Sequence, residues 1–103
     1  MYRVRFHPLV SRDLEAIAQW IIEYAGSAAA NRKLMEIEQT ITGLGQVPHK
    51  GSVRDEVAPG LRAIPAGRRA VIAFTVDDDT EEVLVLAVTY SGGDWAGRSR
   101  ARL

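Results

Sequence analysis

The sequence predicts one α+β domain in which a helical hairpin packs on one face of a small, mostly antiparallel sheet. Apolar residues recur at helical spacing between residues 8 and 44, and apolar runs typical of strands dominate residues 61–90. The chain has 103 residues, of which 47% are apolar and 25% charged, which suits a single globular domain and not a disordered segment. We therefore expect one domain over residues 1–103 with the order β-α-α-β-β-β, ending in a flexible basic tail at 96–103.

The first half of the chain supplies one strand and both helices. Residues 2–6 alternate polar and apolar side chains, which predicts a short strand. Pro8 suits the first turn of a helix, and an apolar face then continues at helical spacing over residues 8–25. Gly26 interrupts this pattern before a second helix, which is expected over residues 28–44. Because the connection is so short, the two helices should form an antiparallel hairpin.

The second half supplies the rest of the sheet. Residues 45–60 show no period and indicate a long loop, a type of segment that often carries function. Strands are expected over residues 61–65, 69–77 and 82–90. The acidic turn between the last two strands predicts a β-hairpin.

The predicted core joins the apolar faces of the two helices to the sheet. Its members share either a position on one helix face or a place in an apolar strand. We expect these side chains to be buried together: Leu14, Ile17, Ile21, Leu34, Ile37, Ile41, Ile64, Ile72, Phe74, Leu84 and Leu86.

The composition excludes several classes of site. No cysteine is present, which rules out disulfides, thiolate zinc sites and cysteine nucleophiles and makes a cytoplasmic location the expectation. The two histidines, His7 and His49, lack the spacing of a zinc site, and no glycine-rich phosphate loop opens a helix. We expect no metal and no cofactor. No apolar run is long enough to span a membrane.

Charge is balanced overall but segregated along the chain. Thirteen Lys and Arg residues match thirteen Asp and Glu residues, so no global field attracts nucleic acid, and direct sequence-specific binding of nucleic acid is not expected. Five acidic residues lie within residues 77–82, and three arginines lie within residues 98–102. These runs indicate either solvated surface or a polar contact surface for a partner.

Motifs along nearly the whole chain resemble those of the RelE/ParE toxin superfamily. The resemblance runs from residue 2 to about residue 95, and the order and spacing of the motifs make it specific. It implies the fold derived above, a toxin of a type II toxin–antitoxin module, and a cognate antitoxin as partner. The matching segments are Phe6-His7-Pro8 with Asp13-Leu14 and Ile17, Pro48 with Gly51, Gly60-Leu61-Arg62, Gly67-Arg68-Arg69, and Val88 to Trp95.

The resemblance leaves two activities to distinguish. RelE-like members cleave messenger RNA in the ribosome with basic residues on the sheet, whereas ParE-like members inhibit DNA gyrase. Arg69 matches one of the basic positions, but a second position falls on Gly93, and no tyrosine follows Trp95.

Two further features bear on this choice. The chain lacks the positive surplus expected of a protein that sits among ribosomal phosphates. Ala70, Thr75 and Tyr90 depart from the residues usual in ParE-like members. We expect a ParE-like toxin that binds gyrase and is not an enzyme. The alternatives are a RelE-like, metal-independent ribonuclease and an inactive relative that only binds its antitoxin.

The expected partner-binding residues combine aromatic anchors with arginines, because these residue types dominate binding energy at interfaces. They are Trp20, Tyr24, Arg62, Arg69, Trp95, Arg98 and Arg100. For Trp20 the alternative is a core residue on the flank of its helix. In the ribonuclease alternative, Arg62 and Arg69 would clamp the phosphate and Tyr90 would serve in catalysis.

Arg62 and Arg69 are expected at neighbouring positions on one edge of the sheet, and the alternative is that each pairs with a carboxylate and orders the long loop. The tail arginines suggest a target contact. Truncation after Trp95 is therefore expected to abolish the toxicity of a gyrase-type toxin while antitoxin binding survives.

Overall fold

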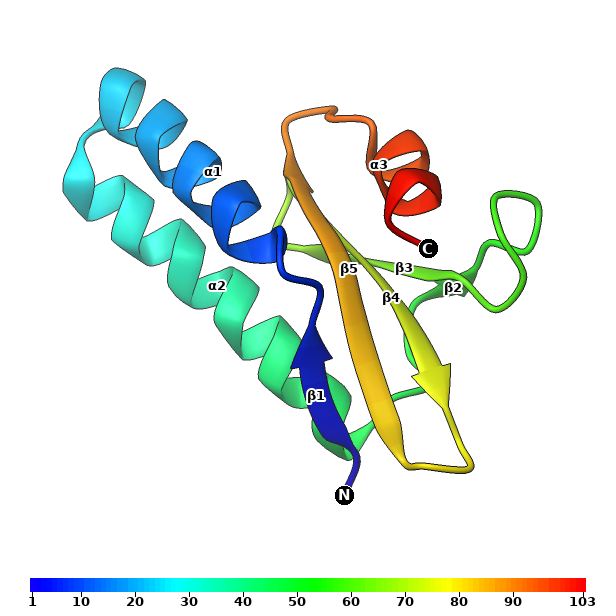
Figure 1. The fold of residues 1–103 in the computed structure, drawn as a ribbon. Coiled ribbons are helices and arrows are strands. Elements are labelled where there is room, and N and C mark those ends of the chain that lie inside the picture. Colours follow the sequence, from blue (N-terminus) through cyan, green and yellow to red (C-terminus); the bar gives the residue numbers. More distant parts are fainter.

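A five-stranded sheet in the order β1-β5-β4-β3-β2 organises the chain, and a computed structural model describes all of residues 1–103 (Figure 1). β1 runs parallel to β5, and the other neighbours are antiparallel. The strands are β1 (Arg3–Phe6), β2 (Ser52–Val53), β3 (Arg62–Ala66), β4 (Ala70–Asp77) and β5 (Glu82–Tyr90). The predicted α+β class and the order of the six expected elements are confirmed, and the structure adds the short strand β2 and a third helix at the C-terminal end.

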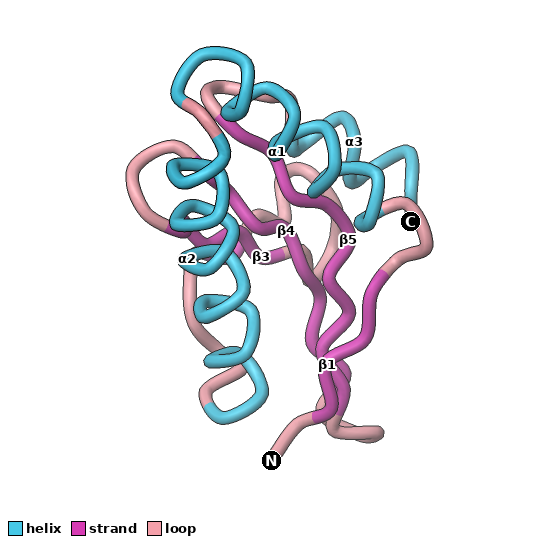
Figure 2. Tube along the Cα trace, turned by 90° about the vertical axis from the view of Figure 1, so that its left-hand side faces the viewer, coloured by secondary structure: helices cyan, strands magenta, loops and turns pink.

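Two long helices cover one face of the sheet, and a third, short helix lies on the other face (Figure 2). α1 (Val10–Ala25) and α2 (Ser27–Gln46) form the expected hairpin around Gly26, whose φ of 88° suits glycine. α1 begins two residues after Pro8, and Ser27 is the first residue of α2 without making a side-chain cap. α3 (Trp95–Arg102) replaces the expected flexible tail.

The main core lies between the helical hairpin and the sheet. Val10, Ile17 and Ile21 of α1 are buried there against the strands. Full burial of each such side chain contributes about 1.5–3 kcal/mol, so this face of α1 holds the helix on the sheet. Of the expected core residues, Leu14, Leu34 and Ile64 are only partly covered, although they pack against the same cluster.

Two leucines of β5 lie outside the core in which the sequence prediction placed them. Ala73 pairs with Ala87 and Phe74 pairs with Val85, so Leu86 is an extra residue in β5. Phe74 and its partner Val85 face the helical hairpin, so Leu84 and Leu86, on either side of Val85, face away from it. They belong to a second, smaller cluster on the α3 side of the sheet. The sequence prediction placed both with Ile72 and Phe74 and was wrong, because the face of each residue in β5 depends on its register against β4.

The long loop after α2 contains a two-residue strand that periodicity did not reveal. Ser52 and Val53 of β2 pair with Ala63 and Arg62 and form one edge of the sheet. Gly51 precedes this strand with φ of 75°, and the carbonyl oxygen of Ala63 lies where a side chain would be. The loop is therefore fixed to β3 at its centre.

Candidate functional site

Three aromatic side chains form a cluster where α1 meets the end of β5. Trp20 and Tyr24 are four residues apart and so share a face of α1, and Tyr90 is the last residue of β5. The Trp20 ring centroid lies 4.7 Å from that of Tyr24 and 5.5 Å from that of Tyr90, with both pairs edge-on. Such pairs contribute about 0.5–1.5 kcal/mol beyond area burial, which fixes the rings in place. We call these three residues the aromatic cluster.

The aromatic cluster is open to solvent on its outer side. Trp20 is 44% exposed and Tyr24 is 54% exposed, so the alternative of Trp20 as a core residue does not hold. Tyr90 is partly covered, and burial together with its interaction with Tyr24 raises the pKa of its hydroxyl. Arg69 lies beside Tyr90, because Ala70 pairs with Tyr90 and the Ser91 N–H donates to the carbonyl oxygen of Arg69 at 2.8 Å. The positive charge of Arg69 acts in the opposite direction on the pKa of Tyr90.

Trp20 separates two open hollows in the surface. The first hollow, of about 380 Å³, has an apolar lining from Ala16, Ile17 and Val88, with Arg98 and Asp13 among its polar groups. The second hollow, of about 320 Å³, is formed by Trp20, Glu23, Tyr24 and Arg69. An arginine thus stands on each side of the exposed indole.

Arg62 and Arg69 do not lie together. Arg62 pairs with Phe74, whereas Ala66 and Ala70 close the turn beside Arg69, so the two arginines occupy opposite ends of the β3–β4 hairpin. With a rise of about 3.3 Å per residue, this placement separates them by well over 10 Å. The expectation of neighbouring side chains on one sheet edge is wrong, because Arg69 precedes β4 and Arg62 faces the end of that strand.

Arg62 belongs to a different group of side chains at the far end of the sheet. Its Nη1 donates to the carbonyl oxygen of Lys50 at 3.3 Å. Nearby, the Tyr2 hydroxyl donates to Asp78 Oδ1 at 2.6 Å, and His49 Nε2 lies 2.8 Å from the same oxygen. The Tyr2 hydroxyl and then His49 and Arg62 lower the pKa of Asp78.

Trp95 stands apart from the aromatic cluster. It begins α3 and packs against the smaller apolar cluster on the other face of the sheet. The guanidinium of Arg54 lies 5.7 Å from the centre of its ring, a cation–π arrangement. The structure therefore gives Trp95 a role in attaching α3 and the long loop to the sheet.

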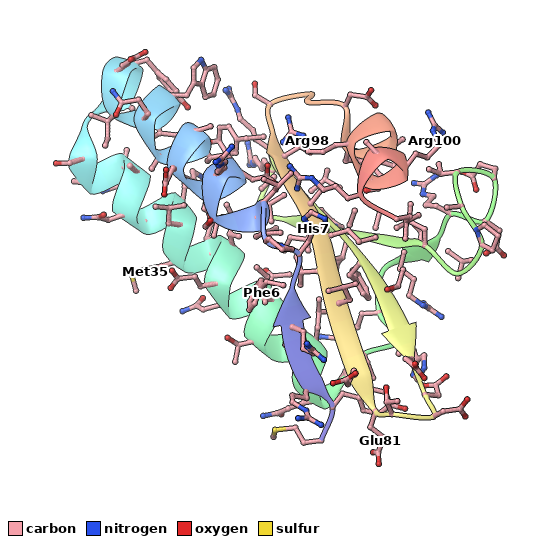
Figure 3. All side chains as sticks on the ribbon, in the orientation of Figure 1. Phe6, His7, Met35, Glu81, Arg98 and Arg100 are labelled. Carbon is pink, nitrogen blue, oxygen red and sulfur yellow. The ribbon has the colours of Figure 1, made fainter.

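A buried ion pair fastens α3 to α1. Asp13 is almost fully covered, and its two carboxylate oxygens accept hydrogen bonds from Arg102 Nη1 at 2.6 Å and Nη2 at 2.8 Å. Arg98 makes a single, longer contact of 3.3 Å with the same carboxylate. Figure 3 shows Arg98 on the side of α3 toward α1 and Arg100 on the outer side of the helix. The expected basic tail is thus a docked helix, because two of its three arginines have partners inside the molecule.

The same side chains complete the edge of β5 beyond the end of β1. β1 stops at Phe6, which pairs with Val85, so β5 has no strand neighbour on that side from Leu86 onward. Asp13 Oδ2 accepts from the backbone N–H of Val88 at 3.0 Å, and Arg102 Nη1 donates to the carbonyl oxygen of Leu86 at 2.9 Å. Side chains from α1 and α3 therefore satisfy backbone groups that a longer β1 would have paired.

Asp13 and Arg102 are the residues that the sequence analysis missed. Asp13 interrupts the apolar face of α1 between Val10 and Ile17. A lone carboxylate in such a position needs a buried cationic partner, and this was the available signal. The identity of that partner depends on the fold, because Arg102 follows 89 residues later in the chain.

The groups needed for acid–base cleavage of RNA are dispersed. Tyr90 lies in the aromatic cluster, whereas Asp94 caps α3 by accepting from the Gly97 N–H. His49 binds Asp78 at the turn after β4, which is the opposite end of β5 from Tyr90. No group of three or more His, Cys, Asp or Glu side chains is arranged to hold a metal ion, and no helix is both long and apolar enough to cross a membrane.

Comparisons with known proteins gave one family match and similarity to two solved structures. The sequence matches the family described as ParE toxin of the type II toxin–antitoxin system, parDE, over residues 4–95. No curated protein sequence matches this chain. The fold is similar to a structure of the chromosomal ParDE system from P. aeruginosa, with a TM-score of 0.74 and 23% identity, covering 87% of this chain and 96% of that chain. It is also similar to a structure of the toxin–antitoxin complex RelBE2 from Mycobacterium tuberculosis, with a TM-score of 0.57 and 24% identity, covering 86% of this chain and 96% of that chain.

Proposed function

Because this chain belongs to the ParE toxin family of type II toxin–antitoxin systems, we propose that it inhibits DNA gyrase by binding, in the cytoplasm, and that a cognate antitoxin neutralises it. The observation that carries this proposal is the separation of Arg62 from Arg69 at opposite ends of the β3–β4 hairpin. A ribonuclease needs a cationic clamp and a proton-transfer group around one phosphate. Inhibition by binding needs only an exposed, ordered surface.

The aromatic cluster with its flanking arginines is the surface that we assign to partner binding. Trp20 and Tyr24 are exposed yet held edge-on against each other, so little side-chain freedom remains to be lost on binding. Aromatic and arginine side chains of this kind supply most of the binding energy at interfaces. Both structural relatives are toxin–antitoxin systems, which supports an antitoxin as one of the partners.

A supercoiling assay tests the gyrase proposal. Purified full-length protein should inhibit supercoiling of relaxed plasmid by gyrase, and Trp20→Ala should weaken that inhibition. Arg32→Gln is the matched control, because Arg32 is an exposed cation of α2 with no side-chain partner. Undiminished supercoiling at a large excess of protein would refute gyrase as the target. Co-purification with the product of the neighbouring reading frame tests the antitoxin separately.

The ribonuclease alternative retains one supporting observation: Arg69 lies beside Tyr90, since Ala70 pairs with Tyr90 and the Ser91 N–H donates to the carbonyl oxygen of Arg69. Messenger-RNA integrity after regulated expression distinguishes the two activities. Cleaved messages that disappear with Arg69→Ala and with Tyr90→Phe would favour the ribonuclease. Intact messages together with a loss of DNA supercoiling would favour the gyrase inhibitor.

A further inference from the structure

The outer face of α2 is open to solvent along most of the helix. Its exposed residues recur three or four positions apart, so they lie on one side of the helix. We propose that this face pairs with the same face of a second copy of the chain, with the two α2 helices antiparallel and each Met35 seated in a hollow of the other. The inference does not rest on the proposed target. The residues of this surface, which we call the outer α2 face, are Ala28, Arg32, Met35, Glu38, Gln39 and Thr42.

Met35 is the apolar residue at the centre of the outer α2 face. Its side chain is 57% exposed and points from α2 into solvent (Figure 3). The opposite side of the helix buries Ile37, Ile41 and Leu44 in the core, so Met35 contributes nothing to that core. A flexible, unbranched thioether adapts readily to the surface of another chain. Covering Met35 therefore supplies the apolar gain of the proposed contact.

A shallow hollow lies beside Met35 on the same face. Its volume is about 290 Å³, and its lining is Met35, Glu38, Gln39 and Thr42. These residues stand at i, i+3, i+4 and i+7, which is the set of four that receives one side chain of a facing helix in knobs-into-holes packing. A two-fold axis between two copies places each Met35 in the hollow of the other. The contact is therefore reciprocal, and it closes at a dimer.

Charge sets the antiparallel direction of the pair. Arg32 lies on the N-terminal side of Met35 and Glu38 on its C-terminal side, and neither forms an ion pair within the molecule. In an antiparallel pair, Arg32 of each copy approaches Glu38 of the other, whereas a parallel pair would bring like charges together. Such exposed pairs add little affinity, so they fix the direction while Met35 supplies the attraction. A partner of uniform charge would be repelled by one of the two residues.

The size of the outer α2 face sets the strength of the dimer. Ala28 and Thr42, at the two ends of the face, are small enough to let the helix axes approach to about 8–10 Å. One helix pair buries less area than a standard interface, so we expect a reversible dimer with a Kd of about 10–100 µM. No residue of the outer α2 face lines a hollow beside Trp20. The dimer therefore leaves the aromatic cluster open.

Sedimentation equilibrium of the purified full-length protein measures the dimer. The parent should change from monomer to dimer between about 5 and 500 µM. Met35→Lys should raise the Kd at least about tenfold, because an ammonium group would then have to enter each hollow. Glu38→Arg should raise the Kd about fivefold, since it opposes two arginines in each contact. Combining Arg32→Glu with Glu38→Arg in one chain should return the Kd to within about twofold of the parent value.

Chemical cross-linking tests the contact itself, because the chain contains no cysteine. At about 100 µM protein, Met35→Cys should form a covalent dimer with a short bismaleimide. Glu15→Cys, at an exposed position of α1, is the matched control and should form little. Circular dichroism and thermal melting verify that every variant is folded.

Four results would overturn the inference: a parent that stays monomeric at about 500 µM, a Kd unchanged by Met35→Lys, a charge exchange that fails to restore the dimer, or equal cross-linking of the two cysteine variants. None of these measurements involves gyrase or growth. The supercoiling assay is run at about 1 µM protein, below the expected Kd of the dimer, so the Arg32→Gln control there reports on the monomer. Failure of the dimer therefore leaves the proposed target untouched, and failure of the target leaves the dimer untouched.

Discussion

At the scale of single residues, Asp13 connects more of the structure than any side chain of the aromatic cluster. Its carboxylate accepts hydrogen bonds from the β5 backbone at Val88 and from two arginines of α3. A buried pair of this kind adds little net stability compared with a well-packed apolar core, because desolvation offsets the attraction. Removing one partner of the pair lowers the free energy of unfolding strongly, because the other charge then stays buried without a counter-charge.

Replacing Asp13 with alanine should therefore lower the free energy of unfolding by about 3–5 kcal/mol, because Arg102 would remain buried without its partner. Asp13→Asn should cost less, since an amide oxygen still accepts from Val88. Urea unfolding followed by circular dichroism measures both changes. Glu15→Ala, at an exposed position of the same helix, is the control and should stay within about 0.5 kcal/mol of the parent. A similar small change for Asp13→Ala would contradict the importance of the buried pair.

Tyr2 gives a prediction about alkaline pH. Its hydrogen bond to Asp78, together with desolvation and nearby negative charge, raises the pKa of the phenol from 10.0 to about 12. The unfolded chain loses this proton first, so the contribution of Tyr2 to stability is complete below pH 10 and disappears as the pH rises toward 12. The difference in melting temperature between the parent and Tyr2→Phe should shrink over that range. A difference that stays constant from pH 9 to 12 would count against the Tyr2–Asp78 bond, and Asp79→Asn controls for the other charges of the turn.

At the scale of elements, some glycine positions require glycine and others would tolerate a side chain. Gly51 has φ of 75° and faces the carbonyl oxygen of Ala63, which lies too close for a Cβ atom. Gly51→Ala should destabilise the protein by roughly 2 kcal/mol or more and release β2 from β3. Gly43 is a helical glycine with open space around it, so Gly43→Ala should stabilise by about 0.5–1 kcal/mol. Thermal melting of the two variants checks the pair, and equal effects would refute this distinction.

The elements also show how much of the fold could be predicted from the sequence. The helices and the β4–β5 hairpin follow from local periodicity, which is strong in α1 and in the apolar runs around the acidic turn. The bulge at Leu86 could not be predicted, because adding one residue to β5 leaves the apolar run unchanged while reversing the faces that follow. α3 was missed because its composition is polar, and its place depends on the distant Asp13.

The candidate site likewise has features that could be predicted from the sequence and features that could not. Trp20 and Tyr24 were nominated by residue type, because aromatic side chains are typical anchors at interfaces, and the structure shows that both are exposed. The separation of Arg62 from Arg69 was not visible, since it depends on the register of β3 against β4. Residue type was enough to nominate partner-binding candidates, and only the register decided which of them lie together.

At the scale of the whole molecule, α3 and the sheet form one unit, and this changes the expected effect of truncation. Cutting the chain after Trp95 removes Arg98 and Arg102 and uncovers the apolar face around Leu86. The selective loss of toxicity expected from the sequence assumed a free tail. We now expect the truncated protein to lose several kcal/mol of stability and with it both target and antitoxin binding.

Arg100→Ala is the variant that isolates the exposed charge of α3. Its side chain is exposed and has no partner within the molecule, so the melting temperature should match that of the parent. A change in gyrase inhibition by this variant would assign Arg100 to the target contact. A truncated protein that keeps the parent melting temperature would contradict the docked α3.

The position of β5 has a consequence for the order of events during translation. β5 lies between β1 and β4, and its pairing with β1 joins Arg3 to Glu82. A ribosome that has synthesised the helical hairpin has therefore not yet made the strand on which α1 packs most closely. The nascent chain holds an apolar helix face open to solvent until the last strand emerges, and native contacts of such long sequence separation also make folding slow. The antitoxin that we propose as the partner would thus meet a toxin whose sheet closes only when nearly the whole chain has left the ribosome.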